Sequence, residues 1–294
     1  MISPIATGRF APSPTGDLHL GSLVAATASY LNAKQQQGRW LLRIDDIDTP
    51  RVVSGSQDRI CRQLEAYGFE WDKLTIQSQR LAHYEAALAE LAQQGVLYEC
   101  DCTRKQLQQR LGKSGCYDNF CRHRQLKNRI HSSIRITTPD IPWGYQDAIQ
   151  GKQLFDWSSQ SGDFIVKRAD TIFAYHLVAA VDDSDEGITE VIRGADLISS
   201  TAPQQYLQQC LKRSSPLYGH HPIIIDSQSK IKLSKASQAP AIKSEDAVHN
   251  LFDVLTFLNQ HPPSELKKAK LAELWHWAKR NWSLQKINPS LSRD

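Results

Sequence analysis

Two short motifs, about 200 residues apart, carry the side chains best suited to binding phosphate. The first reads RFAPSPTGDLHLGS from Arg9 to Ser22, and its proline-rich loop leads into an expected helix. His19 stands in the first turn of that helix, where backbone N–H groups and the helix dipole already favour a phosphate. Gly21 lacks a side chain, so a flat ring such as adenine can lie close against the backbone.

The second motif reads KLSKAS from Lys232 onward and places two lysines and two serines in one loop. Lys232 and Lys235, together with Ser234, can neutralise negative charge that develops on a polyphosphate. Each motif alone is ambiguous, because a histidine at a helix start is often a cap or a core residue and exposed basic loops are common. Their occurrence in one chain favours the phosphate-binding interpretation of both.

The elements that must position these residues alternate between helix and strand. Helices are expected at 18–38, 54–68 and 81–94, and strands at 40–44 and 222–226. A capping box over Ser54–Gln57 is expected to open the second helix. The alternation predicts a parallel α/β sheet. The segment 239–294 is expected to be helical, with a buried apolar stripe of Leu271, Leu274, Trp275, Ala278 and Trp282.

Between 99 and 168 the pattern changes to cysteines, basic residues and short alternating segments, which predicts a small β-containing insertion. Four of the six cysteines fall within 22 residues: Cys100, Cys102, Cys116 and Cys121. Clustered thiols favour a metal, and thiolate-rich tetrahedral coordination favours Zn²⁺. The chemistry leaves the fourth ligand open between Cys116 and His123, and a site without metal is the alternative.

The same stretch is rich in positive charge, although the net charge of the 294-residue chain is only +4. Nine basic residues lie within the 26 positions from Arg104 to Arg129. A solvated helix face and a phosphate-contacting surface are both consistent with such a run. No apolar run approaches the ~20 residues of a membrane span, and the N-terminus lacks a signal-peptide pattern. We therefore expect a cytoplasmic protein with no membrane partner.

The two phosphate motifs resemble the ATP motifs of class I aminoacyl-tRNA synthetases. The resemblance implies a catalytic pair, His19 and Lys235, that stabilises transition-state charge. It implies an ATP site formed by His19, Gly21, Lys232, Ser234 and Lys235. An amino-acid carboxylate would attack the α-phosphorus of ATP, so no protein nucleophile is needed. Mg²⁺ would accompany the triphosphate.

Three sequence blocks are similar to glutamyl- and glutaminyl-tRNA synthetases: RFAPSPTG from Arg9, RIDDIDTPR from Arg43 and VIRGADL from Val191. The resemblance implies that L-glutamate is held by Arg9, Ala11, Ser13, Asp45, Tyr175 and Arg193. A guanidinium can fork onto the side-chain carboxylate of glutamate, and a protein carboxylate can bind its ammonium group.

Three details of the resemblance affect single residues. Asp45 stands where the family has glutamate, which is one methylene longer. For Arg193, a structural ion pair with Asp196 or Glu190 is the alternative. For the metal, the resemblance implies one structural Zn²⁺ per chain, with Tyr117 as the fourth ligand and Cys116 as its rival. The other three ligands are Cys100, Cys102 and Cys121.

Only 57 residues follow Ser237, fewer than the anticodon-binding region of a glutamyl-tRNA synthetase requires. The resemblance therefore points to a short bacterial paralogue family that activates glutamate without tRNA. That family transfers glutamate to the queuosine base at the wobble position of tRNA(Asp), so the anticodon arm would enter the active site. We expect a monomer. The rivals are a truncated or discriminating glutamyl-tRNA synthetase that charges tRNA(Glu) and a non-catalytic tRNA-binding paralogue.

The resemblance also implies the fold: a Rossmann-type α/β domain with a parallel sheet, a zinc-containing insertion and a small helical C-terminal region. Residues 1–98 are expected to form the first half of the catalytic domain, and 99–168 the insertion. Residues 169–238 would form the second half with the lysine motif, and 239–294 the helical region.

Overall fold

The computed structural model describes residues 5–112, 116–127, 129, 131–225 and 240–293. Lys232, Ser234 and Lys235 of the second motif lie outside the described residues.

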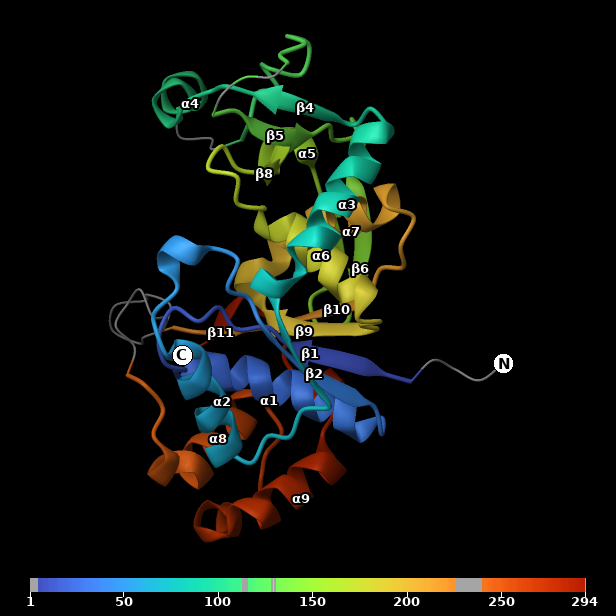
Figure 1. The fold of residues 1–294 in the computed structure, drawn as a ribbon. Coiled ribbons are helices and arrows are strands. Elements are labelled where there is room, and N and C mark those ends of the chain that lie inside the picture. The colour runs from blue at the N-terminus through green and yellow to red at the C-terminus, as the bar shows by residue number, and fades with distance from the viewer. Residues whose placement is uncertain (1–4, 113–115, 128, 130, 226–239, 294) are drawn as a thin grey trace.

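Two adjacent sheets form the middle of the molecule (Figure 1). The first is parallel, in the order β1 (Thr7–Phe10), β2 (Arg39–Ile44), β3 (Lys73–Ile76). The second has the order β7 (Gly151–Phe155), β6 (Trp143–Asp147), β10 (Leu217–His221), β9 (Glu190–Gly194). Only the β6–β7 pairing in that sheet is antiparallel. The Thr7 amide donates to the Thr189 hydroxyl at 2.8 Å, and the Thr189 amide donates to the Thr7 carbonyl at 2.9 Å, so β1 and β9 meet. The predicted α/β fold with its largely parallel strands is confirmed.

Helices pack on both sides of this middle layer (Figure 1). They include α1 (Leu20–Gln35), α2 (Ser56–Ala66), α3 (Leu81–Gln93), α6 (Tyr175–Asp185), α7 (Thr201–Cys210), α8 (Ala247–Phe257) and α9 (Leu271–Asn281). The expected capping box over Ser54–Gln57 is wrong. The residue before α2 is Gly55, which has a φ of 70° and makes no side-chain cap bond. A left-handed residue turns the chain into the helix there, a conformation that glycine adopts at little cost.

The predicted insertion 99–168 is divided between two sheets. Its outer part holds α4 (Arg104–Leu111), α5 (Trp157–Gln160) and an antiparallel sheet of β4 (Leu97–Cys100), β5 (Ser133–Ile136) and β8 (Phe164–Lys167). The hairpin of β6 and β7 instead joins the central sheet, because Asp147 pairs with Tyr218 of β10. The Ala148 amide also donates to the Tyr218 carbonyl at 2.8 Å. Long-range pairing therefore removes this hairpin from the expected insertion.

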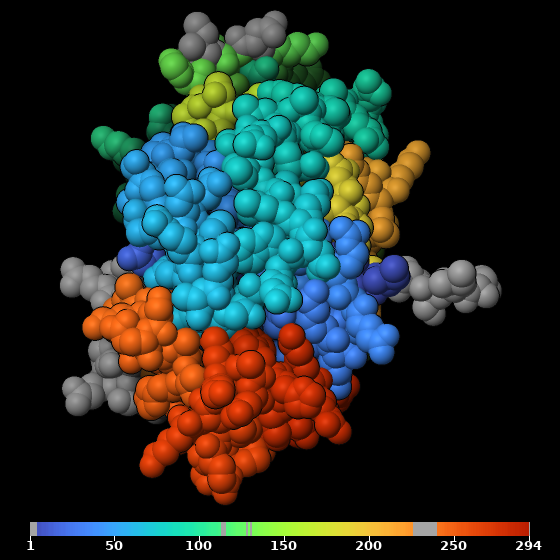
Figure 2. All heavy atoms as spheres, turned by 60° about the horizontal axis from the view of Figure 1, so that its bottom comes forward, coloured from blue at the N-terminus to red at the C-terminus, as the bar shows by residue number. Residues whose placement is uncertain are grey.

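The C-terminal helices share one hydrophobic core with the N-terminal sheet. Tyr30, Trp40, Phe69 and Trp275 form its aromatic centre, with ring centroids 5.1–5.6 Å apart. Figure 2 shows the C-terminal region packed directly against the surface of the N-terminal half. The expected apolar stripe is buried at Leu274, Trp275, Ala278 and Trp282, while Leu271 is half-buried. The predicted strand 222–226 is reduced to β11 (Ile223–Ile224), which pairs with β12 (Ser292–Arg293).

A second core joins α3, α6 and α7 to β8 and thereby attaches the outer sheet to the middle of the molecule. It is built from buried apolar residues on those elements, including Leu88, Val166 and Val178. No helix within the described ranges is long and apolar enough to cross a membrane.

We expect Trp275→Ala to destabilise the whole chain by roughly 3–5 kcal/mol, because it empties the aromatic centre and removes the indole bond to the Tyr67 carbonyl. The measurement is the free energy of unfolding in urea. Trp277→Ala on the same helix is the matched control, since Trp277 lies only partly buried against this core. Equal losses for the two variants would contradict the assignment of Trp275 to the centre.

Candidate active site

A cavity of about 560 Å³ opens at the carboxyl ends of β1 and β9, beside the start of α1. Ligands of open α/β sheets bind in such crevices. Seven of the predicted site residues line it: Arg9, Ala11, Ser13, His19, Gly21, Tyr175 and Arg193. Three separate segments of the chain, around His19, Tyr175 and Arg193, are thus brought together at one place.

His19 is the N-cap residue of α1, and its own ring nitrogen caps the helix. Nδ1 accepts a hydrogen bond from the Ser22 amide at 3.3 Å. A neutral imidazole that accepts at Nδ1 carries its proton on Nε2, which is a donor suited to a phosphate oxygen. The helix end and the ring therefore present positive character on the same side of the cavity.

The loop that carries His19 is fixed by α2. The Gly16 amide donates to the Ser56 hydroxyl at 3.1 Å, and that hydroxyl donates back to the Gly16 carbonyl at 2.7 Å. The Leu18 amide donates to the Gln63 side chain at 2.9 Å. Gly16 has a φ of 131°, a backbone region closed to most side chains. The loop thus depends on glycine at this position.

The described residues on both sides of the lysine motif lie at this cavity. Before the motif, Ile223 and Ile224 line the cavity. After the motif, Ala241 forms an antiparallel bridge with His19, and the Ile242 amide donates to the Leu18 carbonyl at 2.9 Å.

A buried ion-pair network forms the floor below Arg9. Asp183 accepts two bonds from Arg9, both at 3.1 Å, and one from Arg43 at 2.7 Å. Burial acts to raise the pKa of Asp183, but the two guanidinium groups hold that pKa at about 2. Arg9 uses Nε and Nη2 for this pair.

Asp45 belongs to the same network. Its carboxylate accepts from Arg43 at 2.8 Å, and it is not among the described residues that line the cavity. Burial raises its pKa to about 6 although the Arg43 charge opposes the shift. Binding of a substrate ammonium by Asp45 stays a prediction.

Arg193 is buried at the cavity wall, and its guanidinium hydrogen bonds go to uncharged acceptors. The described contacts of Arg193 include no carboxylate, so the alternative of an ion pair with Asp196 or Glu190 is not observed. One of the acceptors is His220, whose far nitrogen lies 2.5 Å from Asp147. The sequence motifs did not single out His220 or Asp147, and the only local signal was a pair of histidines before Pro222.

Three cysteine thiols gather in the outer part of the insertion. The sulfur atoms of Cys100, Cys102 and Cys121 lie within 4.8 Å of one another. The Tyr117 hydroxyl lies 3.4 Å from the Cys100 sulfur and accepts from the Cys121 amide at 3.0 Å. Cys116 instead directs its thiol to the Ser158 carbonyl at 3.0 Å. This group could hold a metal ion, and its donor set is compatible with zinc.

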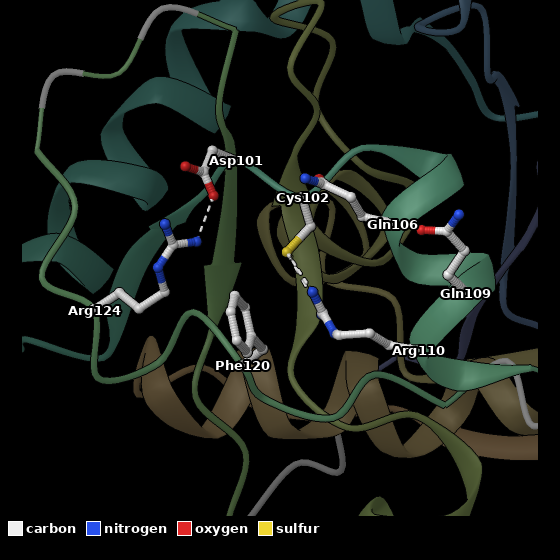
Figure 3. A pocket seen from close by; sticks show the side chains of 7 residues that line it. All are labelled: Asp101, Cys102, Gln106, Gln109, Arg110, Phe120 and Arg124. Atoms are coloured by element: carbon white, nitrogen blue, oxygen red, sulfur yellow. Dashed lines mark hydrogen bonds and ion pairs between the residues drawn. The ribbon is translucent and has the colours of Figure 1, made fainter.

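The pKa values of two thiols in that group shift in opposite directions, because burial and the neighbouring thiols raise the pKa of Cys102 to about 11. Burial acts to raise the pKa of Cys100, but bonds with Tyr117 and Arg135 lower that pKa to about 7. Arg110 reaches the Cys102 sulfur at 3.6 Å, and Arg124 reaches the Cys121 sulfur at 3.4 Å. Figure 3 shows Arg110 pointing directly at the Cys102 sulfur. Both residues line a cavity of about 310 Å³.

The chain belongs to the family of class I tRNA synthetases (E and Q), catalytic domain, whose model matches residues 5–256. It is therefore a ligase of the aminoacyl-tRNA synthetase type. It is 45% identical over 285 residues to the glutamyl-Q tRNA(Asp) synthetase of Ectopseudomonas mendocina (strain ymp), covering 95% of this chain and 94% of that one. It is 46% identical over 278 residues to the protein of the same name from Synechococcus sp., covering 92% of each.

The fold is similar to that of a solved glutamate-tRNA synthetase from Elizabethkingia anophelis, with a TM-score of 0.81. The match covers 99% of this chain and 68% of that chain at 24% identity. At this level of identity the likeness concerns the fold alone.

We expect Asp183→Asn to lower the free energy of unfolding at pH 7 by roughly 3–5 kcal/mol, because it leaves two buried guanidinium groups without their shared carboxylate. The pKa of Asp183 falls from an ordinary 3.8 to about 2 on folding, so its stabilisation is present above pH 4. That stabilisation is lost as the pH falls through 2. The variant should therefore lose less stability than the wild type between pH 4 and pH 2.

Urea unfolding at several pH values measures both effects. Asp253→Asn, at an exposed position on α8, is the control for a change of net charge. If Asp183→Asn and the wild type lost the same free energy of unfolding between pH 4 and pH 2, Asp183 would not be the ionised centre of the network.

Proposed function

We propose that this chain activates L-glutamate with ATP, without tRNA, and transfers the glutamyl group to the queuosine base at the wobble position of tRNA(Asp). The observation that carries the proposal is the 45% identity, over nearly the whole of both chains, with a relative named glutamyl-Q tRNA(Asp) synthetase. The cavity adds chemical support, because phosphate-binding and carboxylate-binding groups line one space.

In the first step, a carboxylate oxygen of glutamate attacks the α-phosphorus of ATP, and the bond to pyrophosphate breaks. His19 and the N-terminus of α1 would bind the phosphates, while Gly21 admits the adenine ring. Lys232, Ser234 and Lys235 would neutralise the departing pyrophosphate, and His19 and Lys235 are the residues proposed to stabilise the transition state. Mg²⁺, when bound with the triphosphate, would supply further charge neutralisation.

The glutamate itself would be held by the remaining lining residues. Arg9 lines the cavity beside its pair with Asp183, and Arg193 offers a guanidinium without a carboxylate partner among the described residues. Tyr175, Ala11 and Ser13 complete the proposed set. Asp45, which is hydrogen-bonded to Arg43, would attract the ammonium group of glutamate electrostatically.

In the second step, a hydroxyl of the cyclopentene diol of queuosine attacks the activated carbonyl carbon. An ester forms, AMP leaves with the electron pair of the broken C–O bond, and the hydroxyl proton passes to the phosphate of AMP or to solvent. The protein then needs a surface for a polyanion near the cavity. Residues 99–131 contain eight Lys or Arg and three Asp or Glu, a net charge of +5, whereas the whole chain carries +4.

The described residues of this segment lie at the outer end of the molecule, with α4 and β4 (Figure 1). Phe120 is half exposed there, between the Arg110 and Arg124 guanidiniums at 4.1 and 5.1 Å from its ring. Such a surface suits the phosphates of an anticodon arm. We further infer that the protein works in the cytoplasm as a monomer. The free cysteines fit a reducing compartment.

The deciding experiment compares glutamylation of tRNA(Asp) that contains queuosine with the same tRNA that lacks it. We expect glutamate-dependent ATP–pyrophosphate exchange without tRNA and labelling of the queuosine-containing tRNA only. Removal of the 3′-terminal adenosine should leave the labelling intact, since the acceptor is a base in the anticodon. Labelling of tRNA(Glu), or loss of label with the 3′ adenosine, would overturn the proposal in favour of a tRNA-charging enzyme.

For the cysteine group we propose one structural Zn²⁺ held by Cys100, Cys102, Tyr117 and Cys121. We expect ~1 zinc per chain by elemental analysis. Cys102→Ser should lose the metal and lower the melting temperature, because a structural metal contributes its binding energy to folding. Cys116→Ser is the matched control and should keep the metal, since this thiol faces the Ser158 carbonyl. Metal loss in Cys116→Ser with full retention in Tyr117→Phe would reverse the choice of fourth ligand.

A further inference from the structure

Arg193 has a complete and uncharged set of hydrogen-bond acceptors. Its Nε donates to His220 at 3.0 Å. Its short terminal bonds go to Gln204 at 2.8 Å from Nη1 and to Thr201 at 2.9 Å from Nη2. Each terminal nitrogen also makes one long bond, to the Tyr175 hydroxyl at 3.4 Å and to the Leu197 carbonyl at 3.3 Å.

The short bonds fix the plane of the guanidinium, and the long bonds are the ones a ligand can replace. A carboxylate has two oxygens at the spacing of the two terminal nitrogens. Arg193 is only 4% exposed and lines the cavity, so a ligand bound in the cavity can supply a carboxylate to this buried positive charge. Burying a positive charge without an ion pair costs free energy. The lack of a carboxylate among the described contacts of Arg193 therefore indicates a binding role rather than a structural one.

The tautomer of His220 follows from its two partners. Arg193 Nε can only donate, so Nε2 of His220 must accept, and the ring proton lies on Nδ1. That proton points to Asp147, whose Oδ2 is 2.5 Å away. The other carboxylate oxygen of Asp147 accepts from the Ile149 and Gln150 amides at 2.9 and 2.8 Å.

The nearest acid in this chain of contacts is therefore separated from Arg193 by one neutral ring. Asp147 fixes the ring and strengthens it as an acceptor without forming an ion pair with the guanidinium. A carboxylate in place of His220 or Gln204 would satisfy the same N–H groups but would neutralise the charge that a ligand needs.

We propose that Asp147, His220 and Gln204 are positioning residues that hold Arg193 fully hydrogen-bonded but unneutralised, and so select an amino acid with an anionic side chain over its amide. This inference rests on the proposed glutamate site. It adds a reason for the selectivity of that site. Neutral side chains of the protein orient the Arg193 guanidinium, and the substrate carboxylate supplies the negative charge that balances it.

Gln204→Glu tests the inference because it is isosteric and adds only a charge, 2.8 Å from Nη1. We expect the KM for glutamate in ATP–pyrophosphate exchange to rise roughly 10- to 100-fold, with the KM for ATP changed less than about threefold. The preference for glutamate over glutamine should fall by a similar factor. Gln208→Glu, one turn further along α7 and also fully buried, is the matched control and should leave the KM for glutamate unchanged.

Asp147→Asn gives a second variant should Gln204→Glu fold poorly. The amides of Ile149 and Gln150 keep an oxygen at their position, so the new NH₂ group faces His220. The ring must then accept at Nδ1 and carry its proton on Nε2, against the Arg193 donor. We expect a rise in the KM for glutamate of about tenfold or more, again without a matching change for ATP.

An unchanged KM for glutamate in both variants would overturn the inference alone, as would an equal rise in the Gln208→Glu control. A wild-type chain without any glutamate-dependent exchange would overturn the proposed function and this inference together.

Discussion

The Asp183 carboxylate is the constraint on which the geometry of the site depends. It sits on α6 and accepts from Arg9 of β1 and Arg43 of β2. The neighbouring Asp182 accepts from Arg80 and from Tyr84 of α3. A shift of α6 by even one residue would leave several buried charges without partners, at a cost of several kcal/mol each. The register of α6 is therefore fixed, and with it the place of Tyr175 at the helix start.

Two arginines of the cavity wall, Arg9 and Arg193, have opposite electrostatic environments. Arg9 is neutralised by a two-pronged pair with Asp183, so much of its charge serves the fold. Arg193 is equally buried but is held by neutral side chains. One cation thus ties the elements together and the other is kept for a ligand. Sequence patterns cannot separate these two roles, because each arginine lies within a buried strand and within a motif of the family.

The parts of the structure that the sequence predicted are those with a local signal. Helical spacing located α1, and the motif around His19 lies at the cavity. The β6–β7 hairpin was misplaced because its partner, Tyr218, lies 71 positions after Asp147. Asp147 and His220 were missed for the same reason: a single acid and a histidine 73 positions later share no local pattern, and only the sheet brings them together. Cys116 and Tyr117 are sequence neighbours, so the backbone direction alone decides which side chain meets Cys100.

The outer sheet is linked to the cavity by a short path that also runs through α6. Phe164 and Val166 of β8 pack in one core with Leu177 and Val178 of α6. Another cavity, of about 340 Å³, lies between α4 and the start of α6 and shares Tyr175 with the 560 Å³ cavity. One side of Tyr175 thus faces the predicted glutamate residues and the other faces the insertion. Because Asp183 fixes the register of α6, the same ion pairs that order the cavity floor also fix the distance between the cavity and the basic outer surface.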